Sequence, residues 1–183
     1  MHRDITVKEY VIIIFMSVSL AVGLNNILLF LNLAEYSTAY QEAVEVLYAQ
    51  GLLEQIFITC ILVPIIEEFI FRGFIFKILR KWIPFVFAMV ISAVLFGFYH
   101  GNLVQFVYAT LCGFVLAYLY ERFQSMVVPV VSHMVMNLVA VLFTEYRIFS
   151  WMLGSTYRAV EITLLCVAEF GFSFYYLQKK CVK

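Results

Sequence analysis

Six long apolar stretches follow one another along this chain, and no other feature restricts its fold as strongly. They cover residues 10–33, 52–76, 83–100, 103–120, 126–144 and 160–177. A helix needs about 20 apolar residues to cross a bilayer, and each stretch reaches or approaches that length. Runs such as VIIIF and FVFAMVI lack the alternation of polar and apolar residues that a membrane barrel requires. The sequence therefore predicts an all-α polytopic membrane bundle of about six transmembrane helices.

The composition supports an integral membrane protein. Hydrophobic residues make up 64% of the 183 residues and charged residues 13%, whereas soluble domains have about 45–50% and about 25%. The net charge is zero and no basic tract is present, so we expect membrane lipid rather than nucleic acid as a partner. The composition shows no shift along the chain, which predicts a single transmembrane domain over residues 1–183.

Lysine and arginine are distributed unevenly between the two sides of the expected bundle. If the N-terminus lies inside, nine basic residues fall at the inner ends of the stretches and two, Arg147 and Arg158, at the outer ends. The nine are Arg3, Lys8, Lys77, Arg80, Lys81, Arg122, Lys179, Lys180 and Lys183. Because positive charge stays on the cytoplasmic side, the sequence predicts that both termini are cytoplasmic.

The first outer connection has the pattern of a short helix. Thr38 and Gln41 have the spacing of a capping box, and an apolar face follows at helical spacing, formed by Tyr40, Val44, Leu47 and Tyr48. A helix lying on the outer interface and the beginning of the second span both remain open at this point.

The segment EEFIFRG places three ionisable residues inside the second apolar stretch. Such a side chain at the bilayer centre costs about 2.5–3.5 kcal/mol, so these groups must pair or face a wet cavity. Glu68 and Arg72 are one helical turn apart and are expected to form an ion pair. Glu67 is rotated by about 100° and is left for another role. Pro64, one turn earlier, predicts a loosened helix beside the acids, because proline cannot donate a backbone hydrogen bond.

Two later stretches carry polar side chains that are able to meet Glu67. The third ends with Phe96 and His100 one turn apart, and the fifth contains His133 and Asn137 at the same spacing. If the helices pack together, these groups hold and polarise a water molecule whose proton Glu67 takes as a general base. His100, His133 and Asn137 would orient the water, stabilise an oxyanion or bind a divalent metal.

Each of these features also has a purely structural interpretation. The Glu68–Arg72 pair can hold helices together, and a histidine near a helix end, such as His100, is often interfacial. Phe96 taken alone fits core packing, and the polar pair of the fifth stretch can bond neighbouring helices. Only the combination favours a hydrolytic site inside the membrane.

The combination resembles the three motifs of the CPBP family, the CAAX-processing and bacteriocin-processing intramembrane proteases also called Abi. These motifs are E-E-x-x-x-R at 67–72, F-x-x-x-H at 96–100 and H-x-x-x-N at 133–137, within a protease-like core of approximately 52–140. The resemblance implies an intramembrane endopeptidase acting on membrane-associated peptides or proteins. It assigns water activation to Glu67 and the water, oxyanion or metal contacts to His100, His133 and Asn137, with Glu68, Arg72 and Phe96 in support.

The resemblance leaves the cofactor and the biological role open. A divalent metal such as zinc at Glu67, His100, His133 and Asn137 is an alternative to a glutamate-activated water. The metal-free mechanism is favoured because the chain lacks an H-E-x-x-H motif and asparagine is a poor zinc ligand. Bacterial members of the family are linked to peptide processing or bacteriocin immunity, which suggests the bacterial cytoplasmic membrane.

Two other functions compete with proteolysis. A non-catalytic immunity protein would use the same cavity to sequester a membrane-active peptide. A small transporter or proton channel would use the acids and histidines as a relay, with Glu169 of the last stretch as a further member. The chain has no inverted repeat, which argues against a transporter.

The depths of the candidate residues do not agree on a simple drawing of straight spans. At about 1.5 Å per residue, His133 lies about 10 Å from the inner surface, whereas His100 ends an outward span and lies farther out. We therefore predict that the turn around Gly101 is buried within the protein. For Glu169, pairing with Arg72 and a place in the cavity lining are both open, and structural pairing is favoured.

Overall fold

The computed structural model describes residues 5–33 and 37–179. Over these ranges all regular structure is helical. The α-helices are α1 (Val7–Phe30), α2 (Thr38–Tyr48), α3 (Leu52–Gln55), α4 (Val63–Glu68), α5 (Lys77–Trp82), α6 (Phe85–Tyr99), α7 (Leu103–Phe123), α8 (Val127–Glu145), α9 (Ile148–Leu153) and α10 (Thr156–Lys179). Two π-helical segments, η2 (Ile56–Leu62) and η3 (Phe69–Phe76), join α3, α4 and α5 into one unbroken helix, Leu52–Trp82.

The winding of the Leu52–Trp82 helix changes beside the paired acids. In η2 the backbone N–H of Val63 bonds the carbonyl of Ile58, five residues earlier, and Pro64 follows directly. Proline has no N–H to give to the preceding turn, and single π turns are frequent at functional sites. The loosened helix predicted beside Pro64 is present.

The structure confirms a helical membrane bundle, but the number of candidate spans is lower than six. In the described part of the chain four helices, α1, α7, α8 and α10, are long and apolar enough to cross a bilayer. The bent pair of α2 and Leu52–Trp82 adds a fifth candidate if it counts as one span. The third stretch forms α6, whose 15 residues span about 22 Å, less than the hydrocarbon core of about 30 Å.

The first connection forms a separate helix rather than the beginning of the second span. The axis of α2 is bent by 115° from that of Leu52–Trp82. The N-cap is Ser37, whose hydroxyl oxygen accepts a hydrogen bond from the N–H of Tyr40 at 3.3 Å. The sequence pattern placed the cap at Thr38, so the observed cap lies one residue earlier than predicted.

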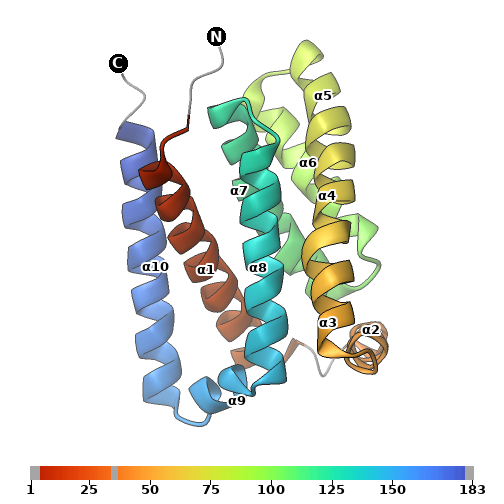
Figure 1. Ribbon diagram of the computed structural model, residues 1–183, viewed down its shortest axis with the longest axis vertical. Helices are drawn as coiled ribbons and strands as arrows, with labels where there is room; N and C mark the ends of the chain where they lie inside the picture. Colours follow the sequence, from red (N-terminus) through yellow and green to blue (C-terminus); the bar gives the residue numbers. More distant parts are fainter. Residues whose placement is uncertain (1–4, 34–36, 180–183) are drawn as a thin grey trace.

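The long helices run side by side along the long axis of the molecule (Figure 1). The start of α1 and the end of α10 lie at one end, while α2 and α9 lie at the other (Figure 1). α1 packs against α8 and α10, and α6 packs against α7. The N-terminal helix α1 thus lies between α10 and α8, which carries two of the motif residues.

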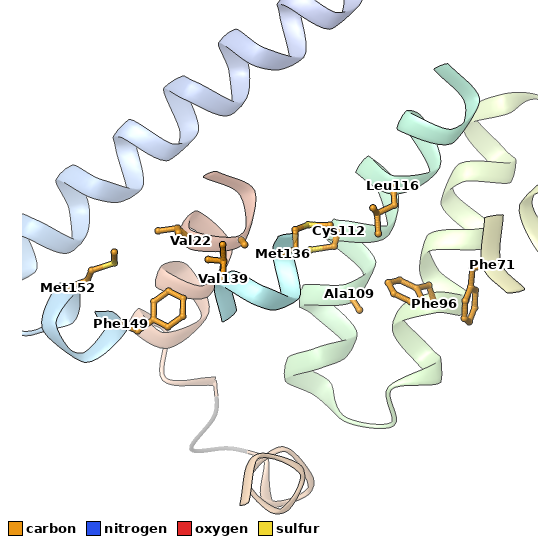
Figure 2. Close-up of a cluster of buried hydrophobic side chains, with 11 residues drawn as sticks. Val22, Phe71, Phe96, Ala109, Cys112, Leu116, Met136, Val139, Phe149 and Met152 are labelled. Carbon is orange, nitrogen blue, oxygen red and sulfur yellow. The ribbon is translucent and has the colours of Figure 1, made fainter. Parts of the chain in front are cut away.

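A buried hydrophobic cluster connects the helices that carry the motifs. The rings of Phe71 in η3 and Phe96 in α6 meet edge to face with centroids 5.0 Å apart. Met136 of α8 and Cys112 of α7 belong to the same cluster (Figure 2). The cluster therefore joins the helices that carry the three motifs to α7.

The close approach of α6 and α7 depends on two glycines. A Cβ atom added to Gly97 would lie 2.1 Å from Oγ1 of Thr110. A Cβ atom added to Gly113 would lie 3.1 Å from Ala93 and 3.3 Å from Nη2 of Arg72. Small residues allow helices to approach closely in membranes, and here they bring the backbone of α7 next to Arg72.

The turn between α6 and α7 is not buried, so the prediction for Gly101 is wrong. Gly101 adopts a positive φ of 73° and is exposed, while His100 and Asn102 on either side are half-buried. The turn lies nearer the middle of the long axis than α2 and α9 do (Figure 1). Because α6 is short, His100 reaches the depth of the other motif residues without a buried loop.

Candidate active site

The ion pair predicted between Glu68 and Arg72 is present and deeply buried. Nη1 of Arg72 donates to Oε1 of Glu68 at 2.8 Å, and both side chains are 0% exposed. Nη2 of Arg72 donates to the carbonyl of Gly113 at 3.1 Å, and the guanidinium lies over the ring of Phe96 at 4.6 Å. A charge at this depth is tolerated because it is paired and hydrogen-bonded.

Glu68 has a second partner that the sequence pattern did not predict. Nδ1 of His133 lies 2.9 Å from the same Oε1 atom that binds Arg72. A carboxylate accepts hydrogen bonds only, so Nδ1 carries the proton and Nε2 is left to face Glu67. Glu68 therefore fixes both the orientation and the tautomer of His133. The two residues are 65 positions apart in the sequence, and no local spacing indicates such a contact.

Glu67 is the acid that remains free, as predicted. Its side chain is buried, with 5% exposed, and its carboxylate makes no direct hydrogen bond among the described residues. Nε2 of His133 lies 3.7 Å from Oε2 of Glu67. That distance is too long for a direct hydrogen bond. The Glu67 carboxylate is thus held ready for a further ligand.

His100 reaches the same region from the end of α6. Its Nδ1 lies 2.9 Å from the carbonyl oxygen of Phe96, which makes Nδ1 the donor and leaves Nε2 free. The Phe96 ring meets both imidazoles edge to face, with centroids 5.0 Å from His100 and 5.6 Å from His133. Phe96 therefore acts as a spacer that positions the two histidines relative to each other.

Asn137 lies one turn after His133 on α8 and anchors this helix to η2. Its Nδ2 donates to the carbonyl of Thr59 at 2.8 Å. The amide nitrogen carries two hydrogens, so one remains for another acceptor. The sequence pattern identified Asn137 but contained no signal for the Thr59 carbonyl that orients it.

All four predicted side chains line one central cavity of about 420 Å³. Glu67, His100, His133 and Asn137 come from α4, α6 and α8, and further walls come from α1, α2 and α7. A volume of this size falls in the range of ligand pockets and exceeds that of a single water, about 30 Å³. The predicted convergence of Glu67, the two histidines and Asn137 is confirmed.

The cavity walls include tyrosines that the sequence pattern did not single out as site residues. Tyr40 and Tyr48 come from α2 and Tyr108 from α7. Among the described residues that line the central cavity, the ionisable side chains of acid, lysine, arginine or histidine type are Glu67, His100 and His133. The walls therefore offer aromatic and apolar surface with few charges.

Glu169 takes no part in this site, so the expected contact with Arg72 or with the cavity is wrong. On α10 its Oε1 accepts a hydrogen bond from Oγ of Ser173 at 2.5 Å, one turn later in the same helix. It is not among the residues that line the central cavity. α10 packs on α1 rather than on the motif helices, which explains the separation.

A divalent metal at Glu67, His100, His133 and Asn137 stays a prediction. In the described part of the chain no group of three or more His, Cys, Asp and Glu residues is placed to hold a metal ion. Nδ1 of each histidine is bonded to a protein acceptor, and the amide nitrogen of Asn137 donates to Thr59. These bonds leave Nε2 of both histidines available, and metal-ligating histidines usually hold their other ring nitrogen in this way.

Comparison with known proteins identifies the family of the chain. Residues 49–139, which contain Glu67, His100, His133 and Asn137, match the family model described as type II CAAX prenyl endopeptidase Rce1-like. A protein of Bacillus subtilis (strain 168) named "Putative membrane peptidase YdiL" is 42% identical over 82 residues, which are 45% of this chain and 34% of that protein. The matched segment thus spans about a third of the relative's length. No solved structure gave a significant match. The chain belongs to the CPBP family of CAAX-protease-like membrane proteins.

Proposed function

We propose that this protein is an intramembrane endopeptidase in which Glu67 activates a water molecule. The observation that carries the proposal is the state of the Glu67 carboxylate. It is buried, faces Nε2 of His133 at 3.7 Å and lines a cavity of about 420 Å³. A carboxylate next to a confined space without a direct hydrogen bond suits a general base, which must reach the proton that it removes.

The proposed reaction uses the side chains of the cavity in two steps. Glu67 takes a proton from water as the water oxygen bonds to the peptide carbonyl carbon, and the carbonyl oxygen becomes an oxyanion. The C–N bond then breaks, and Glu67 returns the proton to the leaving amine. The amide of Asn137 is able to donate to the oxyanion whether or not its neighbours are protonated. Nε2 of His133 donates only when the ring is an imidazolium, because Nδ1 carries the proton of the neutral ring.

The lack of lysine and arginine among the described lining residues supports cleavage of internal peptide bonds. An exopeptidase that removes C-terminal residues holds the terminal carboxylate, for which arginine or lysine is well suited. The described residues that line the central cavity include neither, and Arg72 is fully buried against Glu68. We therefore infer that the substrates are membrane-associated peptides or proteins cut within an apolar segment.

The test compares two carboxylates of the same membrane protein. The purified protein is reconstituted in liposomes with a library of apolar peptides, and the products are identified by mass spectrometry. Glu67→Gln is expected to lower the cleavage rate by about 10²-fold or more. Glu169→Gln removes a carboxylate outside the cavity and is expected to cleave normally. Cleavage by Glu67→Gln at the wild-type rate would overturn the proposal.

A non-catalytic immunity protein is the second candidate. The cavity is large enough to hold peptide side chains without any reaction, and such binding does not require a base. In this case cells carrying Glu67→Gln would still be protected from a membrane-active peptide. Loss of protection in Glu67→Gln, with normal membrane insertion, favours the endopeptidase.

A further inference from the structure

In the long helices that line the central cavity, the lining residues lie toward the same end of the bundle. In α1 the lining residues Asn25 and Leu28 lie near the end of the helix, whereas Lys8 lies in its first turn. In α7 the lining residues lie between 104 and 112, whereas Arg122 lies in the last turn. Both helices thus place the cavity away from their basic ends.

The Leu52–Trp82 helix shows the same order. Its lining residues Thr59, Val63 and Glu67 precede the three basic residues of α5, which are Lys77, Arg80 and Lys81. His100 follows α6 at the end farther from the Trp82–Phe85 connection. The cavity therefore lies toward one end of the bundle rather than passing through it.

The lysines and arginines among the described residues indicate which end of the bundle faces the cytoplasm. We call the end of the bundle that carries the start of α1 and the end of α10 the basic end. Of the nine described lysines and arginines, six lie there, Arg147 and Arg158 lie at the opposite end, and Arg72 is buried between the two ends. The six are Lys8, Lys77, Arg80, Lys81, Arg122 and Lys179. Arg3, Lys180 and Lys183 fall outside the described residues. Positive charge stays cytoplasmic, so the basic end faces the cytoplasm.

The cavity is closed toward the basic end and open at the opposite end. Four lining residues nearest the basic end, Glu67, Phe96, Cys112 and His133, are all buried. The exposed lining residues are Ala43 in α2 and Thr144 near the end of α8, both at the opposite end. The remaining lining residues are buried or half-buried.

The wall at the open end is α2. Tyr40, Val44, Leu47 and Tyr48 face the cavity from this helix. None of the residues of α2 is fully buried, and Glu42 and Glu45 are exposed. α2 therefore has one face toward the cavity and one polar face suited to water or to lipid headgroups.

We propose that substrates reach Glu67 from the extracytoplasmic side of the membrane, through the opening beside Ala43 and Thr144. This inference rests on the proposed endopeptidase function and narrows its substrates. They are peptide segments that lie on the outer surface or in the outer leaflet, and segments confined to the cytoplasm are excluded. The buried residues around Glu67 block approach from the basic end.

The sidedness is tested by labelling single cysteines, which requires no enzymatic activity. Cys166 and Cys181 are replaced by serine, while Cys60 and Cys112 are kept because they are buried. Thr144→Cys reports the opening, and Lys81→Cys, exposed at the basic end, is the matched control. A charged maleimide that cannot cross membranes is added to intact cells and to inside-out vesicles.

We expect Thr144→Cys to be labelled at least about tenfold more strongly in intact cells than in inside-out vesicles, because the bilayer excludes the charged reagent. Lys81→Cys should show the opposite preference. Labelling of Lys81→Cys in intact cells, or of Thr144→Cys only in inside-out vesicles, overturns the proposal whatever the activity of the protein.

A second measurement connects the opening with cleavage. A bulky polymer maleimide attached to Thr144→Cys from outside should lower cleavage at least about tenfold, as a blocked entrance would. The same label on Ser150→Cys, exposed on α9 and outside the cavity lining, should leave cleavage unchanged. Unchanged cleavage after labelling at 144 rejects this entrance. Correct sidedness without any cleavage rejects the endopeptidase instead.

Discussion

At the residue scale, Glu68 is the link between the structural and the reactive parts of the site. One oxygen of Glu68 binds Arg72 at 2.8 Å and His133 at 2.9 Å. Arg72 in turn lies over Phe96, whose ring contacts both histidines. A single buried charge network therefore holds the two imidazoles around the cavity. Glu68 is a positioning residue, because it acts on the cavity through His133.

Removal of the Glu68 carboxylate is expected to destabilise the fold. Glu68→Ala leaves Arg72 buried without its counter-charge, which costs about 3–5 kcal/mol of unfolding free energy. The measurement is unfolding in detergent by heat or denaturant. Glu121→Ala is the matched control, because it breaks the partly exposed pair with Arg80, and such pairs contribute little. Equal unfolding curves for Glu68→Ala and wild type would contradict the account.

Asn137 is expected to affect the rate of the reaction more than substrate binding. Asn137→Asp keeps the size of the side chain but, when ionised, removes both amide hydrogens, so the oxyanion loses a donor. Loss of one such donor lowers kcat by about 10²–10³, while KM should change little. Steady-state kinetics in liposomes separate the two constants. A rise in KM alone would assign Asn137 to substrate binding.

The motif residues of the site could be predicted from the sequence, but their contacts could not. The spacing of Glu68 and Arg72 predicts their ion pair, because both lie on one helix. The contact of Glu68 with His133 joins residues that are far apart in the chain. The carbonyls of Thr59 and Gly113 are backbone acceptors, and no side-chain pattern marks them. Tertiary packing alone brings these groups together.

At the element scale, the pairing of α6 with α7 determines where His100 lies. α6 is short, and it approaches α7 closely at Gly97. The apolar pattern predicted the helix correctly but not its depth, because the sequence does not indicate how far a span tilts or how closely it packs. The error at Gly101 came from this missing information. The bend after α2 and the π-winding of η2 and η3 likewise depend on neighbouring helices.

Gly97→Ala should therefore disturb the site without touching a polar residue. The new Cβ would lie 2.1 Å from Oγ1 of Thr110 and 2.7 Å from the carbonyl of Phe106, so α6 and α7 must separate. Overpacking of this kind costs about 1–3 kcal/mol, and cleavage should fall as His100 moves. In the control Gly171→Ala, the new Cβ has no neighbour within 4 Å, and neither stability nor cleavage should fall. Wild-type behaviour of Gly97→Ala would contradict the close packing.

At the scale of the whole molecule, most basic side chains and the candidate active site lie in different parts of the bundle. Most of the described basic side chains gather at one end, and the exposed lining residues of the cavity, Ala43 and Thr144, lie toward the other. The apolar stretches predicted the helical membrane bundle, whereas the cytoplasmic position of both termini, inferred from lysine and arginine, stays a prediction. The cavity itself was foreseen only as a meeting point of four side chains, since its walls include α2 and three tyrosines that no motif contains.

The most direct test of the account is an experimental structure of the Glu67→Gln protein in lipid with an uncleaved peptide bound. The account predicts a peptide carbonyl carbon within about 4 Å of the residue 67 side chain, with the carbonyl oxygen at hydrogen-bond distance from Nδ2 of Asn137. The peptide should enter between α2 and the end of α8. A peptide bound outside the central cavity, or a cavity filled by packed side chains, would contradict the account.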